Sequence, residues 1–208
     1  WGIPKHTLSR TLFPLGNLTK EEVREIAREN KLETAEIPES MEICFVADNN
    51  YKRFLADYVP DRMDAVGSGV IVDESGETVG AHDGYPHYTI GQRKGLGLSN
   101  PEPRYVTQIE PSLNQIKIGK KEALLKNACS MSQVNWLVTP MNFPCEVESQ
   151  IRYNSPVVSA EIIKNNSGYE ITFQKPQSAI TPGQSIVFYQ DDVVLGGGII
   201  ERNTCSDE

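Results

Sequence analysis

The sequence predicts an α+β protein that is mainly β, with the tail of an α/β domain, a small central β-rich domain and a C-terminal small β-barrel. Two observations predict this class. A helical pattern followed by a short apolar run occupies residues 1–47, and helix before buried strand is typical of α/β domains. From residue 67 onward short β segments alternate with turn residues, and their regular spacing after residue 120 indicates a barrel. We place the domains at 1–47, 48–120 and 121–208.

The composition is that of an ordinary globular protein, with 38% hydrophobic and 23% charged residues among 208. The chain contains neither the run of about 18 apolar residues that a membrane span needs nor an opening signal segment. We therefore expect no membrane contact. A chain of this length does not need disulfides, so we expect a reducing, cytoplasmic setting, and we expect a monomer. The chain starts at Trp1 rather than at a methionine, and we interpret it as part of a longer protein. Its net charge of -8 excludes a general nucleic-acid binder, so any RNA contact needs a local basic patch.

The first domain begins with a short helical segment at 5–12 and then a well-marked helix start. Thr19 is the expected N-cap, and Glu22 three residues later completes a capping box. Asn30 is the expected stop. The apolar run 43–46 has the length and composition of a buried strand.

The central domain is expected to open with a helix capped by Asp48 and ended by Pro60, because apolar residues recur with helical spacing between them. The pattern then becomes β. Two hairpins are expected, the first pairing 70–72 with 77–79 and the second pairing 105–109 with 115–118.

The C-terminal domain contains six short apolar segments separated by turn residues, which predicts a small closed barrel. The expected strands are 132–136, 145–153, 157–163, 169–173, 185–189 and 193–200.

Cys44 lies inside the apolar run 43–46 and has two interpretations. It is either a small buried hydrophobic residue, as free cysteines often are, or a reactive sulfur at the end of a strand beside Glu39 and Glu42. The other cysteines, Cys129, Cys145 and Cys205, are expected in strands or the tail. None of the four has the spacing of metal ligands, and we predict no metal site.

The segment 91–97, Gly-Gln-Arg-Lys-Gly-Leu-Gly, is the most specific loop. Its glycines permit close backbone approach, and Arg93 and Lys94 offer charge to a phosphate. It matches no nucleotide-binding motif, so an RNA-backbone contact and an ordinary turn with solvated cations both stay open. The histidines have no metal or triad spacing, and His82 and His87 are expected in loops.

Arg152 and Tyr153 end one expected barrel strand. A guanidinium beside an aromatic ring suits phosphate contact and base stacking, whereas general surface statistics favour a salt-bridged strand end with a half-buried tyrosine. Gln184 closes the turn 181–184 and either donates to RNA or only completes the turn. Three successive glycines at 196–198 indicate a bulge or close backbone packing rather than a phosphate loop.

Taken in order, these motifs resemble the bacterial tRNA-specific 2-thiouridylases over nearly the whole chain. The matching segments are 12–16, 42–46, 87–97, 152–153, 181–184 and 195–200. One such match is weak, whereas six in the same order are specific.

The resemblance implies a tRNA-uridine 2-sulfurtransferase that makes 2-thiouridine at the wobble position. ATP, with Mg²⁺, adenylates the uridine C2 oxygen, and a sulfur-relay protein supplies sulfur that a cysteine matching Cys44 carries as a persulfide. The ATP site and a second cysteine belong to the ATP-pyrophosphatase domain, of which 1–47 is the C-terminal end. Arg152, Tyr153 and Gln184 match positions that touch tRNA.

The sequence departs from the family pattern at Met41, where a glutamine-like residue is common before the cysteine. It also lacks the nucleotide-binding loop and the second cysteine, so we expect the chain alone to be inactive. Two other functions remain open. One is a non-catalytic tRNA-binding module, and the other is a redox switch that pairs Cys44 with another cysteine.

Overall fold

The computed structural model describes residues 1–37, 46, 48, 50–98, 102–140, 142–153, 155–166 and 168–202. The chain divides into two compact units. One unit contains residues 6–60, and the other combines residues 1–5 with residues 61–208. The prediction for 43–45, including Cys44, lies outside the described residues.

The unit formed by residues 6–60 is helical among the described residues, with the elements η1 (Lys5–Arg10), α1 (Lys20–Glu29), η2 (Glu33–Glu36) and α2 (Tyr51–Tyr58). The predicted capping box at the start of α1 is confirmed. The Thr19 hydroxyl accepts a hydrogen bond from the Glu22 backbone N–H, and the Glu22 carboxylate accepts one from the Thr19 backbone N–H at 2.6 Å. These two hydrogen bonds give acceptors to backbone N–H groups that have no intrahelical partner at the start of a helix.

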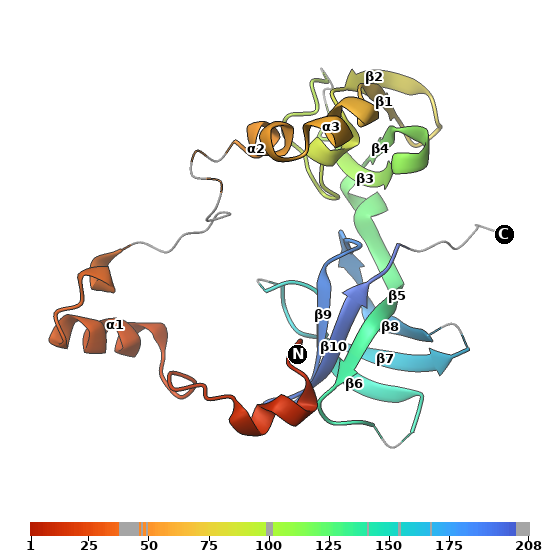
Figure 1. Ribbon diagram of the computed structural model, residues 1–208. Coiled ribbons are helices and arrows are strands. Elements are labelled where there is room, and N and C mark those ends of the chain that lie inside the picture. The colour runs from red at the N-terminus through yellow and green to blue at the C-terminus, as the bar shows by residue number, and fades with distance from the viewer. Residues whose placement is uncertain are drawn as a thin grey trace. The chain divides into compact units, whose positions relative to one another are not determined.

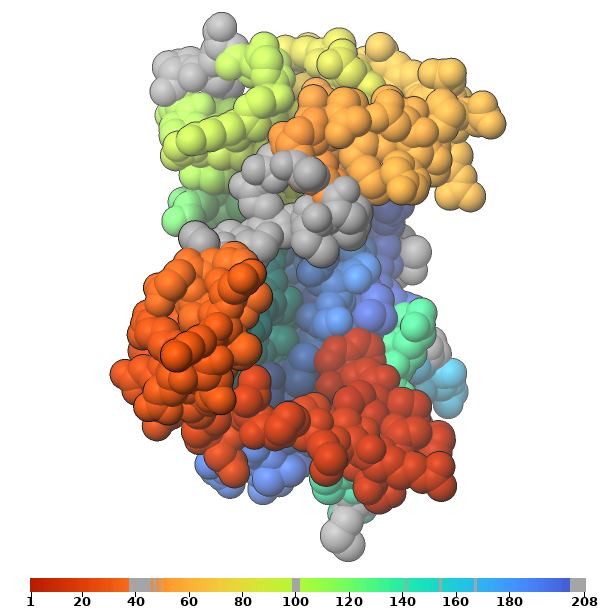
Figure 2. All heavy atoms as spheres, turned by 60° about the vertical axis from the view of Figure 1, so that its left-hand side comes forward, coloured from red at the N-terminus to blue at the C-terminus, as the bar shows by residue number. Residues whose placement is uncertain are grey.

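The apolar stripe of α1 is not buried. Among the described residues of this unit only Ala35 and Val46 are buried, while Leu12 is 88% and Phe13 65% exposed. Figure 2 shows residues 1–37, in red and orange, at the surface of that view. The amphipathic pattern therefore predicted the helix, whereas the described residues of the chain do not cover its apolar side.

One expectation about the second helix is wrong. The N-cap of α2 is Asn50, whose side chain accepts a hydrogen bond from the Arg53 N–H at 3.0 Å; Asp48 instead pairs with the Arg53 guanidinium at 2.8 Å. The helix ends just before Pro60, as expected, but Pro60 also begins a further short helix, α3 (Pro60–Val66), that was not expected. Proline suits the first turn of a helix because the N–H that it lacks would have no intrahelical acceptor there.

The central sheet has four strands in the order β2-β1-β4-β3 (Figure 1), namely β1 (Gly69–Val72), β2 (Thr78–His82), β3 (Tyr105–Glu110) and β4 (Gln115–Gly119). Both predicted hairpins are present and antiparallel. The two are joined by a parallel pairing of β1 with β4. Ile71, Val106 and Ile116 are fully buried in the core of this sheet.

His82 is not a loop residue. It ends β2 with 2% of its surface exposed, while His87 lies in the short helix η3 (Tyr85–His87). The Gly84 backbone N–H donates to Nδ1 of His82 at 3.0 Å, so the ring proton is on Nε2, which donates to the Asn114 carbonyl at 3.2 Å. Burial lowers the pKa of His82 because it disfavours the charged ring. The histidine therefore serves as a neutral cross-link within the sheet.

The predicted barrel is confirmed as a closed six-stranded barrel in the order β10-β5-β8-β7-β6-β9 (Figure 1). Every neighbouring pair is antiparallel, and closure leaves no edge strand. Its strands, several longer or shorter than expected, are β5 (Leu125–Trp136), β6 (Cys145–Gln150), β7 (Val158–Asn165), β8 (Gly168–Ser178), β9 (Ser185–Gln190) and β10 (Val193–Ile200).

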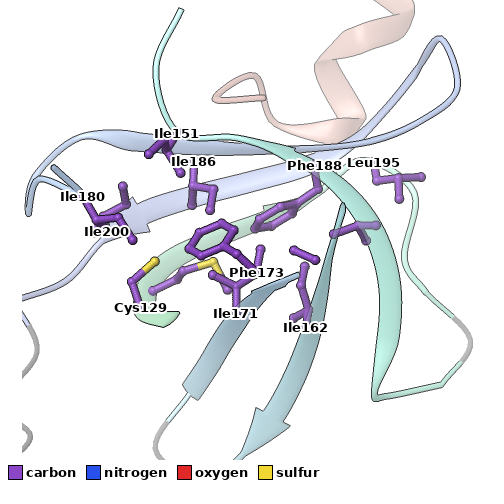
Figure 3. Close-up of a cluster of buried hydrophobic side chains, with 13 residues drawn as sticks. Cys129, Ile151, Ile162, Ile171, Phe173, Ile180, Ile186, Phe188, Leu195 and Ile200 are labelled. Atoms are coloured by element: carbon purple, nitrogen blue, oxygen red, sulfur yellow. The ribbon is translucent and has the colours of Figure 1, made fainter. Parts of the chain in front are cut away.

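The barrel interior is apolar and closely packed. Figure 3 shows Phe173 and Phe188 at the centre of the cluster, with the Cys129 sulfur directed into it. Ile162, Ile171 and Phe188 are fully buried. A core of this kind makes the barrel a rigid support for the turns that connect its strands.

Candidate nucleic-acid interface

Arg152 and Tyr153 were expected to end a strand. They lie instead in the turn that follows β6. The Ser155 backbone N–H donates to the Arg152 carbonyl at 3.0 Å, and the Arg152 N–H donates to the Ser155 hydroxyl at 3.2 Å. The Gln150 amide donates to the carbonyl oxygens of Tyr153 at 3.1 Å and Ser155 at 2.8 Å. These bonds give the turn a defined backbone.

The Arg152 guanidinium is held by a neighbouring turn. It donates to the backbone carbonyl of Ala179 and to the hydroxyl of Thr181 at 3.2 Å. In that turn the Gln184 N–H donates to the Thr181 carbonyl at 3.2 Å, and Gly183 has a φ of 85°. Proline followed by a positive-φ glycine is the pattern of a type II turn. The structure thus brings two motifs about thirty residues apart in sequence into direct contact.

Tyr153 is 94% exposed. Its ring therefore makes almost no contact with the described parts of the protein, and the alternative of a half-buried tyrosine does not hold. An aromatic ring held on an ordered turn is the type of group on which an unstacked base can lie.

The loop 91–97 is anchored on both sides of its two cations. The Gly91 N–H donates to the Val106 carbonyl at 2.8 Å, and Leu96 is buried in the core of the sheet. Between them the Gln92 side chain accepts from the Thr89 N–H at 3.1 Å and donates to the Lys94 carbonyl at 2.9 Å. Arg93 and Lys94 are left exposed on this fixed backbone.

This loop approaches the Arg152 site at one point. A Cβ atom at Gly91 would lie 3.1 Å from the Cβ of Ala179, so the loop backbone and Ala179 are in close contact. Ala179 has a φ of 54°, and its carbonyl is the acceptor for Arg152. The three sequence motifs 91–97, 152–153 and 181–184 therefore converge on a single residue.

The cations of this site lack an acidic partner among the described residues. Within the described ranges no carboxylate lies within ion-pair distance of Arg93, Lys94 or Arg152, although several other arginines are paired. The alternative of a salt-bridged strand end therefore fails for Arg152. In a chain of net charge -8, two such cations on the loop 91–97 and one beside the exposed Tyr153 are groups able to contact phosphate.

The described cysteines offer no reactive sulfur. Cys129 in β5 and Cys145 in β6 are free thiols, as the strand assignment predicted. Burial raises the pKa of Cys129 to about 12, and burial together with Glu161 raises the pKa of Cys145. Both thiols are therefore poor nucleophiles. Cys44 and Cys205 lie outside the described residues, so the role of Cys44 stays a prediction.

The described residues contain no group of three or more His, Cys, Asp or Glu side chains placed to hold a metal ion. No helix in the described part of the chain has the length and apolar character to cross a membrane.

Sequence reasoning missed three residues that build this site. Gln92 and Gln150 shape the two turns, and Ala179 joins them. Gln92 could have been found, because it stands inside a glycine-rich motif. The role of Ala179 depends on a positive φ and on long-range contacts, and no local signal reports either.

Three family models match successive parts of the chain. The tRNA methyl transferase HUP domain matches residues 1–48, the tRNA methyl transferase PRC-barrel domain matches 52–120, and the aminomethyltransferase beta-barrel domain matches 126–200. Together they define a protein that joins a HUP-matched segment to two β domains.

Several relatives are similar along almost all of the chain. The tRNA-specific 2-thiouridylase MnmA of Chlorobium phaeobacteroides is 44% identical over 202 residues, which is 96% of this chain and 56% of the relative. The corresponding proteins of Chlorobium luteolum and Halothermothrix orenii are 46% and 44% identical, over 97% and 98% of this chain and 56% of each relative. The chain belongs to the family of tRNA-specific 2-thiouridylases and spans about half the length of these curated relatives.

Proposed function

We propose that this chain is the tRNA-binding part of a tRNA-uridine 2-sulfurtransferase, and that the whole protein converts a wobble uridine to 2-thiouridine. The observation that carries the proposal is the convergence of three motifs at Ala179, which places unpaired cations and an exposed tyrosine on rigid turns. The names of the relatives supply the substrate class and the sulfur chemistry.

The chemistry of the reaction is proposed to depend on Cys44. In the whole protein this residue would carry sulfur as a persulfide received from a sulfur-relay protein. When bound, ATP with Mg²⁺ would supply the adenylation that turns the uridine C2 oxygen into a leaving group. The chain itself has no nucleotide-binding glycine motif, so ATP would be held elsewhere in the whole protein, and we expect the chain alone to be inactive.

The binding half of the proposal is tested on the chain as it stands. Fluorescence anisotropy with labelled tRNA at several salt concentrations should give measurable affinity with a steep salt dependence, because phosphate contacts release counterions. The double variant Arg93→Ala/Lys94→Ala should bind more weakly and with a smaller salt slope. Lys126→Ala, which removes an exposed cation on β5, is the matched control. Equal losses from both changes would contradict the proposed surface.

The catalytic half is tested in the whole protein by measuring 2-thiouridine in tRNA, comparing wild type with Cys44→Ser. A cysteine-desulfurase donor and chemical sulfide should be run in parallel, because sulfide can bypass a persulfide carrier. Loss of activity with the enzymatic donor is the expected result. Full activity of Cys44→Ser with both donors would favour the alternative of a non-catalytic tRNA-binding module.

A further inference from the structure

The first residues of the chain lie with the barrel rather than with the segment that follows them. Residues 1–5 belong to the same compact unit as residues 61–208, whereas residues 6–60 form the other unit. The HUP-domain model nevertheless matches 1–48 without a break. One end of the HUP-matched segment is therefore seated on the C-terminal barrel (Figure 1).

A single side chain of the barrel holds the backbone of this segment. Asn135, near the end of β5, donates hydrogen bonds from its amide nitrogen to the carbonyl oxygens of Trp1 at 2.5 Å and Ile3 at 2.9 Å. An amide nitrogen has two N–H groups, and both are used here. The contact fixes the path of the segment at two points, two residues apart.

Gly197 of β10 makes room for the tryptophan ring, and its neighbour Gly196 lies against the backbone of β5. A Cβ atom at Gly197 would lie 2.6 Å from Cγ of Trp1 and 2.6 Å from the Ile186 carbonyl, and one at Gly196 would lie 2.3 Å from the Asn135 carbonyl. These distances are far shorter than any real contact, so a side chain could not be accommodated at either position. Gly196 and Gly197 do not have the positive φ that would demand glycine. Space, rather than backbone conformation, explains them.

We infer that Asn135 and Gly197 form a docking site for the segment Trp1–Ile3, which anchors the start of the HUP-matched segment to the C-terminal barrel. The same strand also contacts the candidate interface. Gly183 donates to the Ile200 carbonyl at 2.8 Å, and Ile200 donates to the Gln184 carbonyl at 2.8 Å. Ile200, three residues after Gly197 on β10, thus links the strand that contacts the docked segment to the turn 181–184. This connection bears on tRNA positioning only if the proposed function holds; the docking itself does not depend on it.

The docking is tested in the 208-residue chain by hydrogen exchange measured by mass spectrometry. Asn135→Ala should raise exchange in peptides covering residues 1–5 by about tenfold, since local opening becomes easier when such hydrogen bonds are lost. Asn127→Ala, an exposed asparagine on the same strand, is the matched control and should leave this segment unchanged. Unchanged exchange of residues 1–5 in Asn135→Ala would overturn the inference.

A second variant separates docking from barrel folding. Trp1→Ala removes the ring without altering the barrel, so exchange of residues 1–5 should rise while peptides from β5 and β10 keep their protection. Acrylamide quenching gives an independent readout, because the chain has only two tryptophans and Trp136 provides a constant background. Trp1 should become more accessible in Asn135→Ala. If acrylamide quenches the Trp1 fluorescence equally well in the wild type and in Asn135→Ala, the docking site is refuted. This outcome does not depend on the tRNA-binding experiments.

Discussion

The Arg152 guanidinium donates a hydrogen bond to the backbone carbonyl of Ala179, a residue with the left-handed φ of 54°. This relationship orients the one arginine of the 152–153 turn and ties it to the 181–184 turn. It also leaves the guanidinium without a carboxylate partner among the described residues. Arg152 is thus both an organiser of the site and a free positive charge within it.

Arg152→Lys should weaken tRNA binding although it keeps the charge. A lysine ammonium lacks the planar fork that reaches both the Ala179 carbonyl and the Thr181 hydroxyl. We expect about a tenfold loss, corresponding to about 1.4 kcal/mol, with a salt slope close to that of the wild type. Anisotropy titrations at three salt concentrations measure both quantities. An affinity unchanged by the substitution would show that the charge alone matters.

Tyr153→Ala should weaken tRNA binding without affecting folding. The ring is 94% exposed, so its loss removes almost no packing, whereas base stacking contributes about 1–3 kcal/mol. Tyr153→Phe keeps the ring face and should bind like the wild type. Binding isotherms and urea denaturation of both variants check this. If phenylalanine is as harmful as alanine, the hydroxyl group and not stacking is responsible.

Gly91→Ala should destabilise the protein more than Gly97→Ala. Both glycines have a positive φ, which costs alanine about 1 kcal/mol or more, but only a Cβ at Gly91 would meet Ala179. The free energy of unfolding, measured by urea denaturation, gives the difference. Adding Ala179→Gly to Gly91→Ala should recover the excess loss, because it removes the facing methyl group. Equal losses for the two glycines would mean that the loop does not touch Ala179.

Stability should fall on mild acidification because of His82. Burial lowers its pKa, although the hydrogen bond to Asn114 and the charge of Asp83 oppose this effect. The unfolded chain, with an ordinary histidine pKa of about 6.5, therefore binds the proton first. The free energy of unfolding should be flat above about pH 6.5 and should decrease as the pH is lowered through 6.5 toward the folded-state pKa.

Urea denaturation between about pH 5.5 and 7.5 checks this dependence. His82→Gln should lower stability at every pH and remove most of the slope in this window. His6→Gln, at an exposed histidine, is the control and should keep the slope. The assignment fails if His82→Gln leaves the pH dependence unchanged.

The cysteines should react with iodoacetamide in a definite order. Cys129, with 2% exposure and a pKa of about 12, should stay unlabelled in the folded chain at about pH 8, and Cys145 should react slowly. If Cys44 carries sulfur, it should be labelled first. Peptide mass spectrometry gives the order and also reports any disulfide. Finding Cys129 among the first thiols modified, or bonded to Cys44, would restore the redox-switch alternative.

Much of the architecture was readable from the chain because it depends on local patterns. The Thr19–Glu22 capping box, the two hairpins of the central sheet and the closed barrel follow from periodicity and turn residues. One local error concerned the start of α2, where two neighbouring polar residues could each act as the N-cap. Asn50 rather than Asp48 caps α2, and the Asp48 carboxylate pairs with Arg53 instead. Pro60 follows the end of α2, as expected, and also starts the unexpected helix α3.

The sequence alone determined the fold class, the family resemblance and the identity of the cations and aromatic residue of the candidate site, because these are properties of residue type and order. Tertiary structure alone decided that motifs at 91–97, 152–153 and 181–184 meet at Ala179, that His82 is a buried cross-link, and that Gly197 faces Trp1. Each of these depends on close approach between segments far apart in the chain. Such contacts are set by barrel closure and side-chain packing, which have no local signature in the residues that make them.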